Sequence, residues 1–209
     1  SSSRQRLRTV LVSTEIALAF VLLTGTGMFL SSLRQLQRMD PGFRAENVLT
    51  GSVTLTSAEY RDNQVKQAAF VRDVLSRIQQ QPGVIAAAAT SFVPFSGAGA
   101  ASGSFSIQTK PTQEGEPGPH ADLRAATSGY LAALRIPLMQ GRWFTEGDRA
   151  ETMPVAVIDD VLAKAYWPGQ NSIGNHVRNG RKSTWREIVG VVGHIRGDSL
   201  EVDENKGVI

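Results

Sequence analysis

The sequence contains no cysteine, which excludes disulfide frameworks, thiol nucleophiles and cysteine-ligated zinc. It also lacks a P-loop and a G-x-S-x-G nucleophile motif, so the chain by itself neither hydrolyses ATP nor carries the nucleophile of an α/β-hydrolase. The formal net charge of +3 over 209 residues is too small and too evenly spread to indicate nucleic acid binding. These absences point away from an enzyme, and we expect no cofactor, no metal and no nucleic acid partner.

Only one long hydrophobic run is present, and it lies near the N-terminus. Residues 9–33 carry a single charge, Glu15, and lie between Arg8 and Arg34. The stretch 16–33 is long enough to cross the roughly 30 Å hydrocarbon core of a bilayer as a helix. We therefore predict a transmembrane helix over residues 9–33, after a basic cytoplasmic tail at residues 1–8.

A cleaved secretory signal is the alternative for this run. Arg4, Arg6 and Arg8 would form its positive region, and Gly25 and Gly27 would supply small residues near a cleavage site. Two features argue against a signal. The run is longer than the roughly 7–15 apolar residues of a signal core and contains an acid, and no Ala-x-Ala sequence follows it.

The orientation follows from the size of the two flanks rather than from their charge. Arginines stand on both sides of the run, so their count gives no decisive bias. Everything after Arg34 is a polar chain of domain length, and long domains translocate largely regardless of charge. This favours an N-in, C-out topology with an extracytoplasmic domain.

Glu15 is the unusual residue of the run. An ionisable group costs about 2.5–3.5 kcal/mol near the bilayer centre, and such groups commonly face other helices. Glu15 lies only about two turns after Arg8, so both a helix contact and an acid that reaches the interface remain open. Ser13 and Ala17, at small-xxx-small spacing, favour a contact. We name Glu15, Ser13 and Ala17 as candidate helix-contact residues.

The rest of the chain alternates between strand and helix patterns, which indicates an α+β domain. Residues 34–46 form a juxtamembrane stalk with a turn signal at Asp40-Pro41-Gly42. The predicted strands are residues 48–55, 84–93, 104–109, 121–126 and 153–158, the last apolar on both faces and therefore buried. The predicted helices are residues 61–81, residues 130–134, and a helix capped by Asp159 or Asp160 that runs to Trp167. A turn at Asn179-Gly180 joins residues 175–178 to 184–195 as a hairpin.

Several residue groups resemble chemical sites only weakly. Gly97-Ala98-Gly99 with Gly103 precedes a strand instead of a helix, which favours a loop over a phosphate site. Three histidines are too scattered to indicate a metal site or a triad: His120, His176 and His194. The acid pairs Glu146/Asp148 and Asp159/Asp160 are explained by a turn and a helix cap. A solvated hairpin tip accounts better than nucleic acid for the basic group Arg178, Arg181, Lys182 and Arg186 with Trp185.

The order of short motifs along the chain resembles the MacB-like permeases of ABC transporters, in particular their duplicated orphan-permease branch. No single motif is specific, but order and spacing together match over nearly the whole chain. Ser128 and Leu131 stand where Pro and Phe are expected, and Asp159-Asp160 where Asn-Glu is common. The motif positions that we carry over as structural are Pro41, Gly42, Phe43, Pro82, Gly83, Tyr130, Gly141, Arg142, Trp167, Pro168, Gly169, Gly174 and Gly190.

The resemblance implies a first transmembrane helix followed by a periplasmic core domain in the bacterial inner membrane. That domain would have a membrane-proximal porter-like lobe, which includes residues 47–95, and an inserted strand-rich lobe with a truncated C-terminal end, residues 96–209. The implied partners are a separate ATP-binding subunit, other permease helices or a second permease copy, the membrane, and a periplasmic adaptor. The implied function is export driven by ATP hydrolysis in that subunit. A single-span extracytoplasmic sensor or adhesion module is the alternative.

Overall fold

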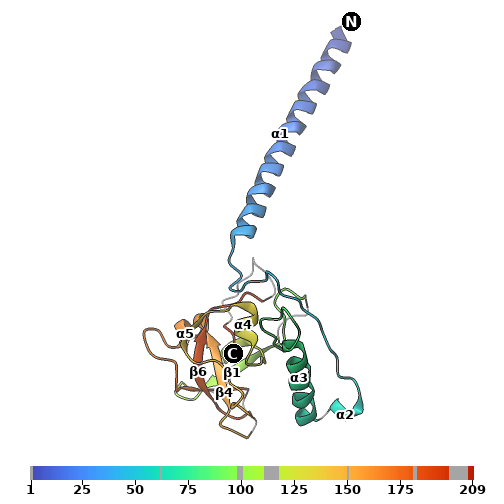
Figure 1. Ribbon diagram of the computed structural model, residues 1–209. Helices are drawn as coiled ribbons and strands as arrows, with labels where there is room; N and C mark the ends of the chain where they lie inside the picture. The colour runs from blue at the N-terminus through green and yellow to red at the C-terminus, as the bar shows by residue number, and fades with distance from the viewer. Residues whose placement is uncertain are drawn as a thin grey trace. The chain divides into compact units, whose positions relative to one another are not determined.

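The computed structural model describes residues 2–61, 63–97, 101–110, 118–149, 151–180, 183–197 and 207–209 (Figure 1). The chain divides into two compact units, Ser1–Asp40 and Pro41–Ile209. The first unit is one helix and the second is a mixed α/β domain, which confirms the predicted fold class. The predicted division of the second unit into two lobes stays a prediction.

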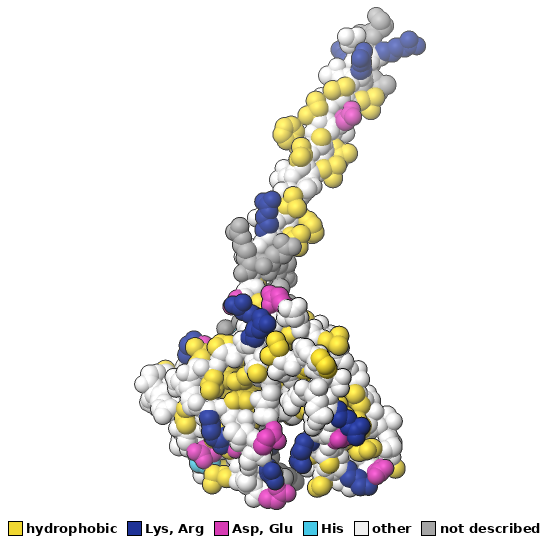
Figure 2. All heavy atoms as spheres, viewed as in Figure 1, with side chains coloured by type: hydrophobic (Ala, Val, Ile, Leu, Met, Phe, Trp, Pro, Cys, Tyr) yellow, Lys and Arg dark blue, Asp and Glu magenta, His cyan; other side chains and the backbone are white. Residues whose placement is uncertain are grey.

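The first unit consists of α1 (Ser2–Arg38), a continuous helix that contains the whole predicted run. Within the described residues, α1 is the one helix long and apolar enough to cross a membrane, over Arg4–Gln35. Figure 2 shows its apolar side chains exposed between basic groups. The Thr14, Thr24 and Thr26 hydroxyls donate to carbonyl oxygens one turn back, at 2.8–2.9 Å. These hydroxyls therefore need no other partner inside a bilayer.

The second unit begins with an extended segment and two helices, α2 (Ala58–Arg61) and α3 (Gln64–Gln79). They confirm a helix within the predicted range 61–81. Asn63 caps α3, because its side chain accepts a hydrogen bond from Lys66 N at 3.0 Å. No residue of α3 is fully buried, and Val65 is 78% exposed. On the apolar face of α3, Val71, Val74 and Leu75 are half-buried and Ile78 is 42% exposed, so this face is only partly covered.

Two predicted strands are wrong. Residues 48–55 form no strand, and Leu49 is 98% exposed. Residues 84–93 form only one isolated bridge, Thr90 to Ala126. Both segments alternate as strands do, but an alternating segment becomes a strand only when a neighbour completes its ladder of hydrogen bonds. Among the described residues, no strand pairs with residues 48–55, and the pairing of residues 84–93 is limited to the short contact of 89–91 with 125–127.

Six strands form the sheet of the second unit, in the order β2-β1-β5-β6-β3, with β4 paired to β6 outside this path. Two short helices accompany them, α4 (Tyr130–Leu134) and α5 (Asp160–Tyr166). The strands are β1 (Ala101–Ile107), β2 (His120–Leu123), β3 (Leu138–Gly141), β4 (Val155–Asp159), β5 (His176–Asn179) and β6 (Arg186–Val192). The strand near 104–109, its partner near 121–126, the helix 130–134, the buried strand and the 179–180 hairpin are confirmed. Strand β3 was not predicted.

Strand β6 is the centre of this sheet. Strand β4 runs parallel along β6, from Val155 opposite Glu187 to Asp159 opposite Val192. The beginning of β6 pairs with β5 and its end pairs with β3, both antiparallel. The chain between β4 and β6 contains α5, because parallel strands require a crossover connection.

The last three residues close the strands into a ring. Asp122 N, in β2, donates to Gly207 O, and Ile209 N donates back to Asp122 O, both at 2.9 Å. Asp159 N, in β4, donates to Val208 O at 3.1 Å. Hydrogen bonds therefore run from β2 through β1, β5, β6 and β4 to residues 207–209 and back to β2.

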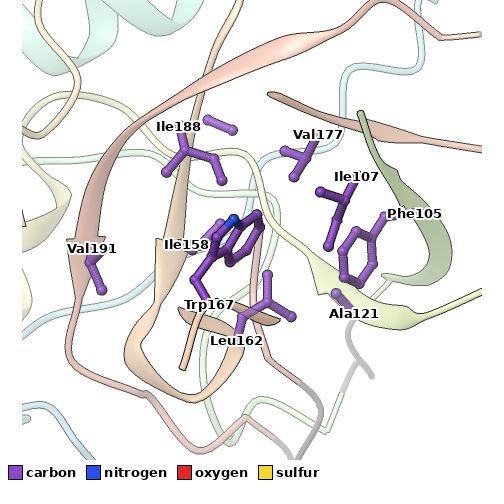
Figure 3. Close-up of a cluster of buried hydrophobic side chains, with 10 residues drawn as sticks. Phe105, Ile107, Ala121, Ile158, Leu162, Trp167, Val177, Ile188 and Val191 are labelled. Carbon is purple, nitrogen blue, oxygen red and sulfur yellow. The ribbon is translucent and has the colours of Figure 1, made fainter. Parts of the chain in front are cut away.

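Two apolar cores lie on opposite faces of β4 and β6. The first core fills the ring and is shown in Figure 3. Its buried members are Phe105, Ile107, Ala121, Ala156, Ile158, Leu162, Trp167, Val177, Ile188 and Val191. The second core lies under α4 and consists of Tyr130, Leu134, Ile136, Val157, Val192 and Ile195, with partly buried neighbours. Since Ile158 belongs to the first core and Val157 to the second, β4 is buried on both faces, as predicted.

Candidate functional site

The second unit begins with Pro41, Gly42 and Phe43, which pack against the chain just after β6. Arg196 N donates to Pro41 O at 3.1 Å. Gly42 has φ +83°, and a Cβ at this position would lie 1.9 Å from His194 O. Only glycine fits, because both the backbone angle and the close approach exclude a side chain. We call residues 41–43 together with residues 194–196 the stalk dock.

A histidine and a buried acid connect the stalk dock to α5. His194 Nδ1 lies 2.5 Å from Asp159 Oδ2, and His194 N donates to Asp160 Oδ1 at 3.0 Å. Asp159 is 1% exposed, and its Oδ1 accepts from Leu162 N at 2.8 Å, which makes it the predicted N-cap of α5. The sequence predicted the cap but gave no signal for the histidine partner, 35 residues away.

A pair of glycines allows β3 and β6 to approach closely at the end of β3. Gly141 is paired with Gly190 in the ladder. A Cβ on Gly141, whose φ is +70°, would lie 2.2 Å from Val189 O, and a Cβ on Gly190 would lie 2.2 Å from Arg142 O. Both carried-over glycines are therefore needed for backbone packing.

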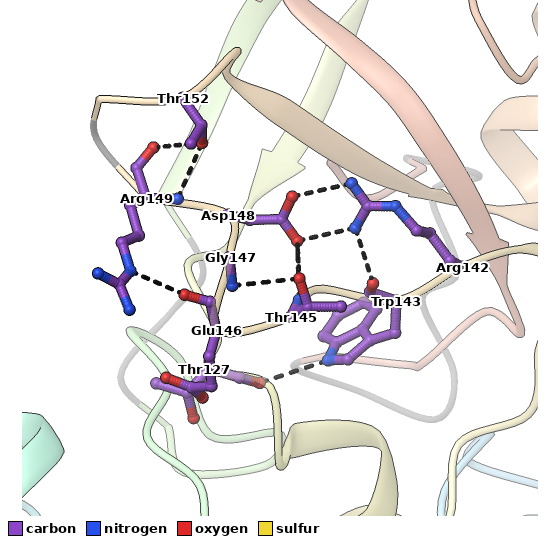
Figure 4. A network of polar contacts seen from close by, with 9 residues as sticks. All are labelled: Thr127, Arg142, Trp143, Thr145, Glu146, Gly147, Asp148, Arg149 and Thr152. Carbon is purple, nitrogen blue, oxygen red and sulfur yellow. Dashed lines mark hydrogen bonds and ion pairs between the residues drawn. The ribbon is translucent and has the colours of Figure 1, made fainter.

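After β3 the chain turns around an ion pair, shown in Figure 4. Arg142 donates from Nη1 and Nη2 to the two carboxylate oxygens of Asp148, at 2.7 and 2.8 Å. The same carboxylate accepts from Thr145 N at 2.7 Å and from Thr145 Oγ1 at 3.0 Å. The Arg142 hydrogen bond and the Thr145 bonds hold the pKa of Asp148 far below its usual range, against the opposing effect of burial. We call Arg142, Thr145 and Asp148 the clamp.

We predict that Asp148→Asn lowers the free energy of unfolding by about 1–2 kcal/mol at pH 7, since hydrogen bonds to a charged group are lost. Folding lowers the pKa of Asp148, so its contribution is present above the unfolded-state pKa of about 3.9. It is lost as the pH falls from there through the folded-state value. Urea unfolding of both variants at pH 7 and at pH 3 measures this difference, which should shrink in acid.

The control is Asp73→Asn on α3, which removes a pair in which Asp73 and Arg77 are 59% and 77% exposed. Such exposed pairs contribute about 0–1 kcal/mol, so this variant should change little. An Asp148→Asn effect that is equal to the control, or that is the same at both pH values, would contradict the clamp's role.

Tyr130 and the aromatic residues after β3 line a small cavity of about 50 Å³ in the second core. The Tyr130 and Trp143 rings stack at 6.4 Å, and Trp143 and Phe144 lie 4.4 Å apart. Burial raises the pKa of Tyr130, and the charge of Arg124 acts in the opposite direction. The cavity wall is largely apolar, and we assign it no ligand.

The other carried-over positions end helices or turns. Trp167 is buried at the C-cap of α5, and its backbone N–H donates to Ala163 O. Pro168 follows it, and Pro82 follows α3. Positive φ angles of 69–85° occur at three glycines: Gly83, Gly169 and Gly174. Like the glycines at the dock and in the sheet, these positions have structural explanations.

The three helix-contact candidates, Ser13, Glu15 and Ala17, are exposed on α1. The continuous helix separates them, because residues two apart lie about 200° apart around the axis. Ser13 and Ala17 share one face, and Glu15 points away from it. The helix contact stays a prediction, but one neighbouring helix does not reach all three residues.

The weaker sequence candidates are dispersed over the domain. Arg178 lies over the Trp185 ring at 4.4 Å, and His120 Nδ1 is 3.0 Å from Gly118 O. Glu146 accepts from the Ser128 hydroxyl at 2.6 Å. Ala98, Gly99, Arg181 and Lys182 lie outside the described residues. Within the part of the chain that the structure describes, no group of three His, Asp or Glu residues is placed to hold a metal ion.

The fold and these contacts define a class: a mixed α/β sheet domain whose first residues follow a long apolar helix in sequence and pack against the segment after its central strand. The model of a family described as MacB-like periplasmic core domain matches residues 10–208. The chain belongs to this family, a component of ABC-type transporter permeases. No curated protein matches the chain in sequence.

The solved structures that are similar to this chain include two transporter domains. The periplasmic region of MacB from Actinobacillus actinomycetemcomitans has 21% identity and a TM-score of 0.43, over 61% of this chain and 54% of that one. The extracellular domain of the noncanonic ABC-type transporter YknZ from Gram-positive bacteria has 18% identity and a TM-score of 0.43, over 62% and 60%. The chain thus spans between about half and three fifths of the length of these two structures.

Proposed function

We propose that the chain is part of a permease subunit whose extracytoplasmic domain is moved by ATP hydrolysis in a separate subunit. The observation that carries this proposal is the stalk dock. The dock follows α1 after two residues and fixes the beginning of the second unit to the segment after β6. A displacement of the end of α1 therefore pulls on a packed element instead of being absorbed by a loose linker.

The contacts beyond the stalk dock give the displacement a path into the sheet. The dock residue His194 is bonded to Asp159 and Asp160, where β4 passes into α5. Asp159 is the last residue of β4, which pairs along nearly the whole of β6. The dock, β4, α5 and β6 are thus expected to move as one body.

The partners follow from the family. A chain without a P-loop needs an ATP-binding subunit, and its span needs other permease helices or a second permease copy beside it. A periplasmic adaptor is a further partner to be tested.

We also propose that residues 47–95 belong to a lobe that another segment completes. The apolar face of α3, of which no residue is fully buried, supports this proposal, since such faces are normally covered.

Membrane anchoring is tested by extraction and proteolysis. Expressed in bacteria, the chain should remain in the membrane through carbonate treatment, because residues 16–33 form an apolar helix of spanning length. Protease added to spheroplasts should digest the domain after Arg34. Recovery of a soluble form shortened near Gly27 would instead show a cleaved signal, and protection of the domain would reverse the topology.

A further inference from the structure

Two exposed arginines lie next to the stalk dock. Arg44 N donates to Leu134 O at 2.9 Å, which brings the backbone of Arg44 close to that of Arg135. Both arginines are exposed, and Arg135 takes a left-handed conformation at the end of α4. The acids nearest to Arg44 in sequence are Asp40 and Glu46.

Exposed apolar residues follow Arg135 closely, at the beginning of β3. Gly193 N donates to Pro137 O at 2.9 Å, one residue before His194. Leu138 and Met139, which follow Pro137, are 43% and 56% exposed. Leu138 pairs with Val192, and Met139 occupies the bulge between Leu138 and the next paired residue. We call Arg44, Arg135, Leu138 and Met139 the pad.

The chain itself limits how far the pad can lie from a membrane. Five helical residues follow Leu33 in α1 and rise about 8 Å, and three further steps reach Pro41 over at most about 10 Å. Pro41 therefore lies within about 18 Å of the hydrocarbon boundary, next to a headgroup layer about 5–8 Å thick. At most about 10–13 Å then separate Pro41 from the headgroups, a gap that the length of an arginine side chain and the screening length of about 8 Å together can bridge.

We propose that the pad is a lipid-binding surface: Arg44 and Arg135 bind anionic headgroups, and Leu138 and Met139 enter the interface between headgroups and acyl chains. Basic residues beside exposed aliphatic ones are the composition by which protein surfaces adhere to anionic bilayers. The proposal rests on the membrane anchoring proposed above. Lipid contact would hold the end of the sheet domain against the membrane and set the resting position of the stalk dock.

The absence of cysteine allows a direct test with single labels. The full chain is prepared as two variants, Met139→Cys and Met153→Cys, and each cysteine is labelled with a fluorophore. Both are reconstituted in vesicles of phosphatidylcholine and phosphatidylglycerol, and nitroxide-labelled lipid in the same vesicles quenches a fluorophore that contacts the membrane. Met153 is a matched control because it is also exposed, at 63%, but lies near the opposite end of β6. It precedes Val155, which pairs near the beginning of β6, whereas Leu138 pairs with the last residue of β6. We expect severalfold stronger quenching of the label at 139 than at 153.

Removal of phosphatidylglycerol, or the double change Arg44→Gln with Arg135→Gln, should return the quenching at 139 to the level at 153. Arg72→Gln with Arg149→Gln, two exposed arginines elsewhere, should leave it unchanged. Equal quenching at both labels in chains that float with the vesicles would overturn the pad. If quenching at 139 rises with the number of chains per vesicle and does not depend on the anionic lipid, the surface contacts a second copy of the chain. That result would also overturn the proposed lipid binding. Chains that fail to float would contradict anchoring itself.

Discussion

Gly141→Ala is expected to abolish the cooperative unfolding transition of the sheet domain, or to lower the free energy of unfolding by more than about 4 kcal/mol. The new Cβ would lie 2.2 Å from Val189 O and 2.6 Å from Ile173 Cδ1, at a φ of +70°. The nearest obstacle is backbone oxygen in the β3–β6 ladder, which cannot move without separating the two strands. Relief would therefore break β3 from β6 and take the clamp with it.

The matched control is Gly169→Ala, which has nearly the same backbone angle, φ +69°, but no atom within 4 Å of the new Cβ. This variant isolates the cost of the left-handed conformation, about 1–2 kcal/mol. Denaturant unfolding followed by tryptophan fluorescence measures both variants, and Trp167 in the first core reports on the sheet. Equal losses in the two variants would show that backbone conformation, and not the close approach of the strands, makes glycine necessary at 141.

The second large effect is expected on coupling rather than on stability. Gly42→Ala places a Cβ 1.9 Å from His194 O and should open the stalk dock. In the assembled transporter, we expect the coupled ATP turnover of the partner to fall by about fivefold or more. Typical coupling free energies between sites correspond to factors of this size. Displacement of α1 would then no longer reach β6 through a fixed contact.

Gly83→Ala is the control for Gly42→Ala, because its φ of +85° is nearly the same and no atom lies within 4 Å of the new Cβ. Hydrogen exchange of the Arg196 amide, which donates to Pro41 O, reports directly whether the dock is open. Unaltered coupled turnover with a rapidly exchanging Arg196 amide would refute mechanical transmission through the dock. The sensor alternative would then become the better hypothesis.

Local patterns gave much of the secondary structure correctly. The helix over residues 9–33, the short helix that begins at Tyr130 and the cap at Asp159 depend on composition, spacing and capping within a few residues. The apolar character of β4 on both faces likewise indicated burial. The motif positions were also available from sequence, but their reasons were not: Gly141 and Gly190 have physical meaning only because they are opposite each other.

The failures share a cause, which is that strand formation depends on a partner elsewhere in the chain. Residues 48–55 have the alternation of a strand but no strand to pair with. Leu138–Gly141 is a strand although none of its residues is buried, because the end of β6 stands beside it. The sequence by itself thus determined the long apolar helix, the capped helices and which segments have an apolar face. Only the tertiary structure decided the strand pairing, the closure of the ring by residues 207–209, the His194–Asp159 contact and the stalk dock. Each of these is made by hydrogen bonds between residues distant in sequence, and local periodicity carries no information about which distant residue will supply the partner.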